Sequence, residues 1–439
     1  MGGNEFMRRR RQLMRMIGRD AIAILPAAPV RHRNGDIEYA YRQDSHFHYL
    51  TGFPEPDAVA VLVPGRPQAE YVLFVRERDP KREAWDGPLA GTEGAVEAFG
   101  ADDAFPIADI DDILPGLMER RSQIFYTMGT HPDFDPLVLA WANAHCGSTR
   151  RGSGAGKGSG VGEFVALTHV LDDMRLYKSR TEQASMRRSV AIAVGAHRRA
   201  MRFTRPGRME YEVMAEVVHE FHRHNAELAY TPIVGGGANA CVMHYRDNDE
   251  VLKDGELLLL DAGCEHEAYA SDITRTFPVG GRFSPAQRAV YEVVLEAQLL
   301  AIDKVRTGND WNDPHDTAVR ALTQGLCKLG LLHGRPSQLI RDRAYLEFFS
   351  HRTGHWLGLD VHDVGDYQVG GEWRLLEAGM ALTVEPGIYI RPSAKIPKEF
   401  WNIGIRIEDD VLVTAGSPEV LSAGLEKNPD AIEGLVQGA

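Results

Sequence analysis

The sequence predicts a two-domain α+β protein, with a smaller N-terminal α/β domain followed by a larger domain of helix pairs and antiparallel strands. A chain of 439 residues is too long for one hydrophobic core. Short apolar runs alternate with helical patterns in the first third, whereas helix pairs precede groups of strands in the remainder. We expect the domains to cover residues 1–173 and 174–439.

The composition excludes several classes of protein. A net charge of −13 argues against a nucleic-acid partner, because phosphates would be repelled. No apolar run approaches the ~18 residues that a membrane span needs. The basic run Arg8–Arg11 resembles the start of a signal peptide, but charged residues interrupt the apolar stretch that should follow. We therefore predict a cytoplasmic protein.

The cysteines give no framework for cross-linking. The four of them, Cys146, Cys241, Cys264 and Cys327, are scattered and form no CxxC pair. Disulfides remain an alternative, but reduced thiols fit a cytoplasmic protein better.

The N-terminal domain is expected to contain a mainly parallel or mixed sheet. Its predicted strands are Ala21–Leu25, Ala58–Val63, Tyr71–Val75 and Gln123–Tyr126, and its predicted helices include Asp111–Glu119 and Pro136–Ala144. The glycine-rich segment Arg150–Gly162 then has the composition of a linker or exposed loop. A phosphate-binding loop is the alternative, but it needs Ser or Thr after its lysine, and Gly158 follows Lys157 here.

The C-terminal domain is expected to pack its helices on one curved antiparallel sheet. A capping box at Ser179 and Glu182 predicts a helix that continues to about Phe203. Ser284 and Pro285 mark a second helix start. Further helices are predicted over 210–224 and from 314 to 330, and further strands over 382–390 and 403–413.

Two acids interrupt the stretch Leu257–Phe277, which reads LLLLDAGCEHEAYASDITRTF. Asp261 ends a run of four leucines and Asp272 opens a second β-type run. Because burying an unpaired carboxylate is very costly, a metal ion or an ion pair must offset the cost. If the two runs pair as a hairpin, both aspartates lie within reach of one ion.

Similar interruptions recur near the C-terminus. The alternation in GIRIEDDVLV places Arg406, Glu408 and Asp410 on one face of a strand, and Glu385 interrupts the β-type run TVEPGIYI. Three histidines accompany them within the segment SHRTGHWLGLDVHD, namely His351, His355 and His362.

Each feature has a plainer interpretation when it stands alone. Paired aspartates often cap turns, charged residues can form a ladder on an exposed strand, and histidines near glycines are commonly core residues. Four carboxylates and one histidine interrupting apolar strands of one domain favour a metal site instead. Oxygen ligands with one imidazole suit Mn²⁺, Co²⁺ or Zn²⁺, and this many carboxylates suit two ions.

These motifs together resemble the pita-bread metallopeptidases, the family of methionine aminopeptidase, aminopeptidase P and prolidase. The strings DAGCEHEAYASDITRTFPV, GHWLGLDVHDVG, LTVEPGIYI and GIRIEDD are most similar to aminopeptidase P. So is YRQDSHFHYLTGFPEPDAV in the N-terminal domain. The resemblance covers essentially the whole chain and implies a pita-bread (creatinase/aminopeptidase) fold after a creatinase-like N-terminal domain.

The resemblance implies a set of ligands for two divalent metal ions, most often Mn²⁺. Asp261 would bind one ion, His355 and Glu385 the other, and Asp272 and Glu408 would bridge the two. A hydroxide shared by the ions would be the nucleophile.

The same resemblance implies roles around the metals. Glu385 would shuttle the proton to the leaving nitrogen, while His244 and His362 would steady the scissile carbonyl and the tetrahedral intermediate. His351, Tyr389 and Arg406 match positions that line the proline-side pocket, and Tyr230 and Trp85 are weaker matches for substrate-contacting aromatics. Trp85 would reach a neighbouring subunit's site, which implies a homo-oligomer, either a dimer or a tetramer.

The implied function is hydrolysis of the N-terminal Xaa-Pro bond in peptides with proline at the second position. Prolidase, which uses the same metal set on dipeptides, is the nearest alternative, and a non-catalytic pita-bread binding protein is a remote one. Two segments depart from the family: the glycine-rich insertion, and Tyr367–Arg374, where a basic loop is expected but Arg374 is the only basic residue.

Overall fold

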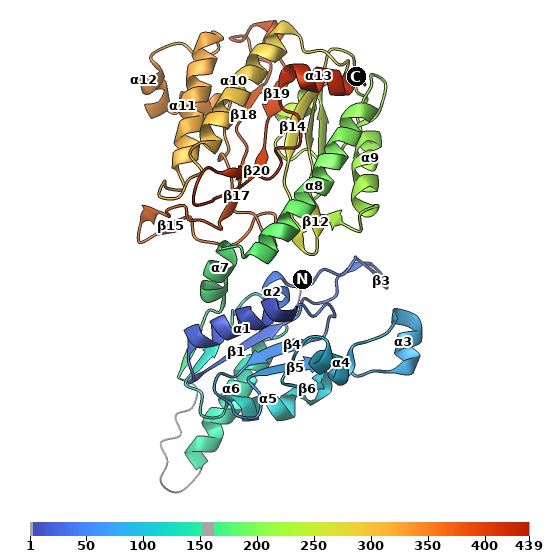
Figure 1. The fold of residues 1–439 in the computed structure, drawn as a ribbon, viewed down its shortest axis with the longest axis vertical. Helices are drawn as coiled ribbons and strands as arrows, with labels where there is room; N and C mark the ends of the chain where they lie inside the picture. The colour runs from blue at the N-terminus through green and yellow to red at the C-terminus, as the bar shows by residue number, and fades with distance from the viewer. Residues whose placement is uncertain (1–2, 152–161, 439) are drawn as a thin grey trace. The chain divides into compact units, whose positions relative to one another are not determined.

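The structure is a computed structural model that describes residues 3–151 and 162–438. Its internal contacts divide the chain into two units, Met1–Met174 and Arg175–Ala439 (Figure 1). Each unit has its own buried apolar core. No helix among the described residues is long and apolar enough to cross a membrane.

The N-terminal unit is built on a six-stranded mixed sheet in the order β6-β5-β4-β1-β7-β8. Strand β1 pairs antiparallel with β4 and parallel with β7, so the mixed arrangement includes both kinds of ladder. The strands are β1 (Ala21–Pro26), β4 (Val59–Leu62), β5 (Tyr71–Val75), β6 (Asp103–Pro106), β7 (Gln123–Phe125) and β8 (Glu163–Val165). A separate hairpin is formed by β2 (His32–Asn34) and β3 (Ile37–Glu38).

Alternate residues of this sheet face the helices that cover it. Ile22, Val61 and Phe74 from neighbouring strands share one buried cluster with Leu114 and Val138 of the covering helices. The helices are α1 (Gly3–Ile17), α2 (Ser45–Thr51), α3 (Pro80–Asp86), α4 (Gly91–Glu97), α5 (Ile110–Met118), α6 (Asp135–Arg151) and α7 (Thr168–Leu176), with a 3₁₀ turn η1 (Ile107–Asp109). The glycine-rich segment predicted at 150–162 lies largely outside the described residues.

The C-terminal unit places helix pairs over several small antiparallel sheets (Figure 1). Its helices are α8 (Arg180–Phe203), α9 (Glu210–His222), α10 (Pro285–Ile302), α11 (Asp313–Lys328), α12 (Pro336–Arg341) and α13 (Pro429–Gln437), with 3₁₀ turns η2 (Gly237–Cys241), η3 (Ala344–Glu347) and η4 (Lys398–Phe400). The predicted capping boxes begin α8 at Ser179 and α10 at Ser284. Buried residues of α8, α9 and α10 share one core with the strands.

The strands of this unit correct the expectation of one curved sheet. They are β9 (Glu227–Leu228), β10 (Ile233–Gly236), β11 (Leu257–Asp261), β12 (Cys264–His266), β13 (Tyr269–Ala270), β14 (Thr274–Pro278), β15 (Gln368–Val369), β16 (Glu372–Trp373), β17 (Ala381–Val384), β18 (Gly387–Ile390), β19 (Ile403–Arg406), β20 (Asp409–Leu412) and β21 (Glu419–Val420). The described strands form the ladders β10-β11-β14, β13-β12-β9, β17-β20-β21, β18-β19 and β15-β16.

Two predicted long strands are each broken, and the breaks lie opposite one another. Val384 pairs with Asp409, and the ladder resumes where Gly387 pairs with Arg406. Pro386 lies in the first gap and lacks the N–H that a continuous ladder needs. The residues released from the ladder, Glu385 and Glu408, therefore lie side by side at the interruption.

The predicted hairpin around Asp261 forms, although it contains an excursion. Asp261 at the end of β11 is the register partner of Thr274 at the start of β14. Between them the chain makes the short strands β12 and β13. The return passes so close to Gly263 that a Cβ there would lie 1.7 Å from the carbonyl oxygen of Ser271. Only glycine fits at this crossing.

A buried ion pair fixes β20 beneath the broken ladder. Arg275 donates to Asp409 over 2.7 Å, and both side chains are fully buried. Asp409 also accepts hydrogen bonds from Lys427, Gln298 and Ser422. Arg275 donates in addition to the backbone carbonyl of Glu408, so the pair positions that residue.

Removing one partner of this ion pair should destabilise the C-terminal unit. We expect Asp409→Asn to lower the free energy of unfolding by about 3 kcal/mol, because Arg275 would remain buried without its counter-charge. Denaturant unfolding followed by circular dichroism measures the change. The control, Asp430→Asn, breaks an exposed arginine pair with Arg288 and should leave stability nearly unchanged. Equal effects of the two variants would contradict the prediction.

Candidate metal centre

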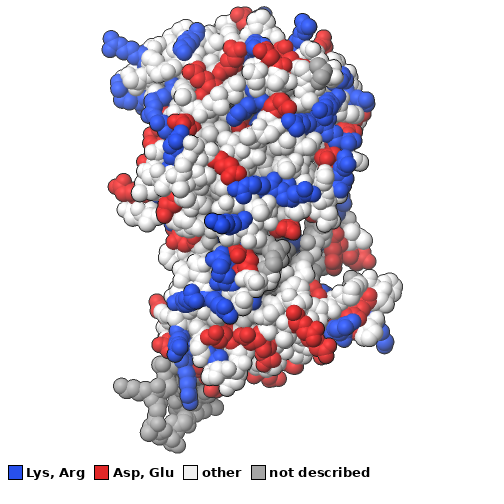
Figure 2. Space-filling view, viewed as in Figure 1, with Lys and Arg blue, Asp and Glu red and all other residues white. Residues whose placement is uncertain are grey.

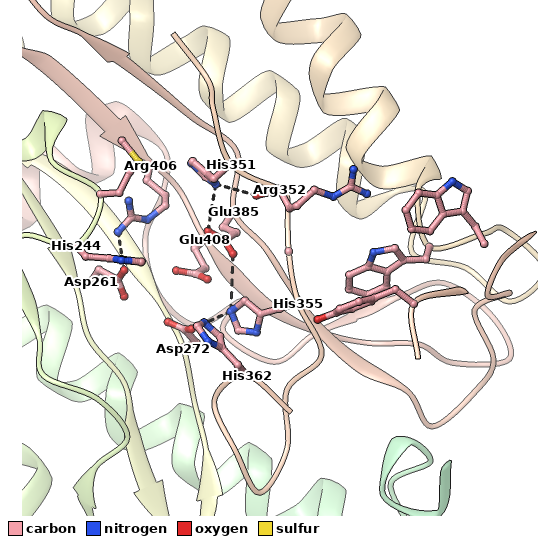
Figure 3. A pocket seen from close by; sticks show the side chains of 15 residues that line it. His244, Asp261, Asp272, His351, Arg352, His355, His362, Glu385, Arg406 and Glu408 are labelled. Atoms are coloured by element: carbon pink, nitrogen blue, oxygen red, sulfur yellow. Dashed lines mark hydrogen bonds and ion pairs between the residues drawn. The ribbon is translucent and has the colours of Figure 1, made fainter. Parts of the chain in front are cut away.

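All five side chains expected to bind metal line one cavity of about 650 Å³ in the C-terminal unit (Figure 3). Asp261 ends β11, and Asp272 comes two residues before β14. Glu385 follows β17 and Glu408 precedes β20, at the two opposed strand breaks. His355 comes from the irregular segment between η3 and β15. Segments far apart in the sequence therefore bring these side chains together.

Three of these residues form the tightest group. One ligand atom each of Asp272, His355 and Glu408 lies within 4.8 Å of the others. The Nε2 atom of His355 is 3.3 Å from Oδ2 of Asp272 and 3.8 Å from Oε1 of Glu385. This spacing suits atoms that share a cation.

The backbone sets the tautomer of His355. Its Nδ1 lies 2.9 Å from the carbonyl oxygen of Trp356, which can only accept a hydrogen bond. In the neutral ring the proton therefore belongs on Nδ1, which leaves the Nε2 lone pair available to bind a cation. A backbone carbonyl behind a ligating imidazole is the usual arrangement in metal sites.

The carboxylates carry more negative charge than their protein partners can balance. Among the described residues, Arg406 is the one arginine in contact with the group. It forms an ion pair of 2.5 Å with Oδ2 of Asp261. Burial followed by repulsion from Asp272 raises the pKa of Glu408 well above its usual value. Burial raises the pKa of Glu385 to about 7. The Oε1 atom of Glu408 is buried without a hydrogen-bond partner, so the residues present fit a bound divalent cation.

The pKa shifts of the closest pair point the same way. Burial alone would raise the pKa of Asp272, but the hydrogen bond and charge of His355 lower it below its usual value. Burial opposes protonation of His355, yet Asp272 raises its pKa to about 9. Burial also raises the pKa of Asp261, despite the neighbouring Arg406. The proton on Nε2 of His355 thus lies where a cation would neutralise the same carboxylates.

Comparison with known proteins identifies the site's family. Residues 184–415 match the description "Metallopeptidase family M24", and residues 6–126 match "Aminopeptidase P, N-terminal domain". The chain belongs to metallopeptidase family M24. It is 42% identical to the Xaa-Pro aminopeptidase of Escherichia coli over 437 residues, which is 99% of this chain and 98% of the relative.

Solved aminopeptidase structures have the same fold. The aminopeptidase PepP of Pseudomonas aeruginosa is 54% identical, with a TM-score of 0.97 and coverage of 100% of this chain and 98% of the other. E. coli aminopeptidase P with the inhibitor Pro-Leu is 41% identical, with a TM-score of 0.95 and coverage of 100% and 99%. The pita-bread fold and its preceding N-terminal domain are thereby confirmed, and the chain is a metal-dependent aminopeptidase.

Tyr230 contacts two of the expected metal ligands and is not among the residues that line the cavity. Its hydroxyl lies 2.5 Å from Oδ1 of Asp261 and 2.5 Å from Oδ1 of Asp272. A hydroxyl has one proton, so it can donate to only one of these carboxylates at a time. It connects the two aspartates through their Oδ1 atoms. Its expected contact with substrate stays a prediction.

A chain of hydrogen bonds runs behind the cluster from Arg406. The guanidinium donates 2.9 Å to the hydroxyl of Tyr389, which lies 2.9 Å from Nε2 of His351. It also donates to Thr274, whose hydroxyl donates over 2.6 Å to Glu408. Arg406, Tyr389 and His351 are thus connected to the expected metal ligands, although Tyr389 is buried and does not line the cavity.

The remaining predicted residues divide between the two units. His244 and His362 both line the cavity, and the rings of His362 and His355 are 4.4 Å apart in an edge-to-face arrangement (Figure 3). Trp85 belongs to α3 of the N-terminal unit, where it is 90% exposed. It is not part of the residues that line this cavity.

Sequence reasoning missed several side chains of the site. Thr274 was readable only as a strand residue, since nothing in DITRTF marks its hydroxyl as a support for Glu408. Other cavity residues are not themselves metal-ligand types, and they are Trp311, Arg352, Tyr367 and Trp373. Aromatic and basic residues are too common to single out by pattern.

Protons and metal ions should compete for the same carboxylates. An acid with a raised pKa in the folded state favours its protonated form, so the metal-free fold should lose stability as pH rises from about 4.3 to the value near 7 of Glu385. Added Mn²⁺ should therefore raise the melting temperature more at pH 8 than at pH 5.5. Scanning calorimetry of metal-stripped protein measures both shifts, and equal shifts would contradict this competition.

Proposed function

We propose that this chain releases the N-terminal residue from peptides whose second residue is proline. The observation that supports this most directly is the cavity that collects all five M24-type ligands, with Glu408 Oε1 buried and unpartnered. The bond is inferred from relatives, since the E. coli relative is named an Xaa-Pro aminopeptidase and a similar structure holds Pro-Leu.

The cavity would hold two divalent ions, with Mn²⁺ the first candidate and Zn²⁺ or Co²⁺ also compatible with the ligands. Asp261 would bind one ion and His355 with Glu385 the other. Asp272 and Glu408 would contact both, which agrees with their place beside His355. Bound ions would supply Lewis acidity and a water of lowered pKa. The charge excess of the carboxylates favours two ions over one.

The chain's own groups would position substrate and move the proton. Burial raises the pKa of Glu385 to about 7 in the metal-free protein. In the loaded site this carboxylate would be the group that takes up a proton and passes it to the leaving nitrogen. His244 and His362 line the same cavity and would donate hydrogen bonds to the oxygen of the scissile carbonyl.

The proline side would be formed around His351. Its Nδ1 lies 2.8 Å from the carbonyl of Arg352 and its Nε2 faces Tyr389, so both ring atoms are engaged. Burial lowers the pKa of His351 to about 3, so the ring is neutral and suited to an apolar proline ring. Arg406 would fix the relative positions of Tyr389 and Asp261 by donating hydrogen bonds to both.

The domain and assembly predictions extend this proposal. We propose domains 1–173 and 174–439, which the contact division into Met1–Met174 and Arg175–Ala439 supports. We also propose a cytoplasmic homo-oligomer, dimer or tetramer. Its support is Trp85, a large apolar side chain that is 90% exposed on α3 and would be covered by contact with another copy.

The partner expected of this chain is a peptide. On the face in Figure 2, acidic and basic side chains intermingle over the C-terminal unit, and the net charge of the whole chain is −13. The prediction of no nucleic-acid partner rests on that net charge.

The proposal predicts a defined substrate pattern. Metal-loaded protein should hydrolyse Ala-Pro-Ala, and should not release the first residue of Ala-Ala-Ala at a comparable rate. Cleavage confined to Ala-Pro, with no tripeptide hydrolysis, would instead identify a prolidase. Absence of all hydrolysis would favour a binding protein. Chromatographic detection of released alanine decides among these outcomes.

Loss of one ligand should abolish the activity. Glu408→Gln keeps the side-chain volume but removes the charge, so we expect kcat to fall by more than about 100-fold. Glu419→Gln, an exposed acid on β21 that pairs with Arg187, is the matched control and should retain activity. Full activity of Glu408→Gln would refute the proposed metal set.

A further inference from the structure

The cavity has a second, chemically different end. Beyond the carboxylates its wall is aromatic and basic, formed by Trp311, Tyr367, Trp373 and Arg352. Figure 3 shows the Arg352 side chain extending away from the metal-binding carboxylates. A substrate lying in the cavity would thus meet negative charge at one end and positive charge at the other.

Arg352 has neutral partners in this wall. Its Nη2 donates over 2.6 Å to the amide oxygen of Asn312, and its guanidinium carbon is 5.3 Å from the ring centre of Trp373. Partial burial lowers the pKa of Arg352 against the opposing charge of Asp316, and the residue as a whole remains exposed to solvent. Among the described residues no carboxylate oxygen lies within 4.0 Å of it, whereas Arg406, the other arginine of the wall, is paired with Asp261.

An arginine in this state favours an incoming carboxylate. A guanidinium presents parallel N–H donors that match a carboxylate, and charge-assisted hydrogen bonds are roughly twice as strong as neutral ones. The N-terminal ammonium of a peptide would be repelled by Arg352. The peptide would therefore place its amino end at the carboxylates and its carboxyl side towards Arg352.

The aromatic part of the wall is rigid. The rings of Trp311 and Trp356 are 4.1 Å apart, and those of Trp311 and Tyr367 are 4.5 Å apart. Trp356 is fully buried and its carbonyl accepts the hydrogen bond from His355. Trp356 thus connects the aromatic wall to the segment that carries His355. The two ends of the cavity therefore keep a fixed relative position.

Arg352 lies close to His355 along the chain. Arg352 precedes His355 by three residues, so their Cα atoms are at most about 11 Å apart. The maximum length of an extended peptide of about three residues is similar to this upper limit. The other basic residue of the region, Arg374, donates to the backbone carbonyl of Asp366 and does not line the cavity.

We propose that Arg352 anchors a subsite for a carboxylate on the leaving side of the substrate, against the wall of Trp311, Tyr367 and Trp373. This inference rests on the proposed function and deepens it, because it adds a determinant of peptide length or sequence. The carboxylate comes either from the C-terminus of a short peptide or from an acidic side chain beyond proline.

Matched substrates test the subsite. Ala-Pro-Ala is compared with its C-terminal amide, and amidated Ala-Pro-Asp with amidated Ala-Pro-Asn. Wild-type protein should prefer the carboxylate in at least one pair by about tenfold or more in kcat/KM. In Arg352→Met that ratio should fall to near one, through KM more than kcat. Arg352→Lys should keep part of the preference, because it keeps the charge.

The comparison within each pair controls for partial loss of folded enzyme, because both substrates meet the same sample. Arg374→Met is the control variant and should keep the wild-type ratio. A ratio near one in both pairs for the wild type, an unchanged ratio in Arg352→Met, or a ratio lost in Arg374→Met would each overturn the subsite. If the wild type hydrolyses none of these peptides, the proposed function fails separately. The same ratios are then measured as binding affinities by calorimetry, with the same outcomes deciding.

Discussion

The mutual repulsion of four buried carboxylates is the constraint on which the C-terminal unit depends. Asp261, Asp272, Glu385 and Glu408 face one cavity, and Arg406 alone among the described arginines contacts them. Burial and repulsion raise the pKa of Glu408 well above its usual value and that of Glu385 to about 7. Protons or cations must make up the charge difference, and divalent metal ions would do this while leaving the carboxylates ionised for binding.

The surrounding fold holds these charges against their repulsion. The ladder of β17 with β20 stops where Glu385 and Glu408 turn into the cavity, and it resumes as β18 with β19. A fully buried ion pair of Arg275 and Asp409 anchors the strand beside this break. The hydroxyl groups of Tyr230 and Thr274 donate hydrogen bonds to Asp272 and Glu408, respectively. These buried interactions thus stabilise the strands that hold the carboxylates in the cavity.

Much of this fold and site could be predicted from the sequence, because the signals are local. Capping residues at Ser179 and Ser284 predicted helix starts correctly, because capping is local chemistry. Carboxylates within apolar runs, as at Asp261, marked the site because such residues are costly in a core. The split of the predicted sheet was missed, since a break at Pro386 depends on the strand that lies opposite. Arg352 was missed because its importance arises from what surrounds it, which no local pattern encodes.

Metal location is the measurement that tests the account most directly. Crystals of the metal-loaded protein, measured on both sides of the manganese absorption edge, would place every Mn²⁺ ion by anomalous scattering. We expect two ions in the cavity, each in contact with Asp272 and Glu408, with His355 Nε2 bound to one of them. Ions bound elsewhere, or a cavity that holds no ion at saturating Mn²⁺, would contradict the proposed metal centre.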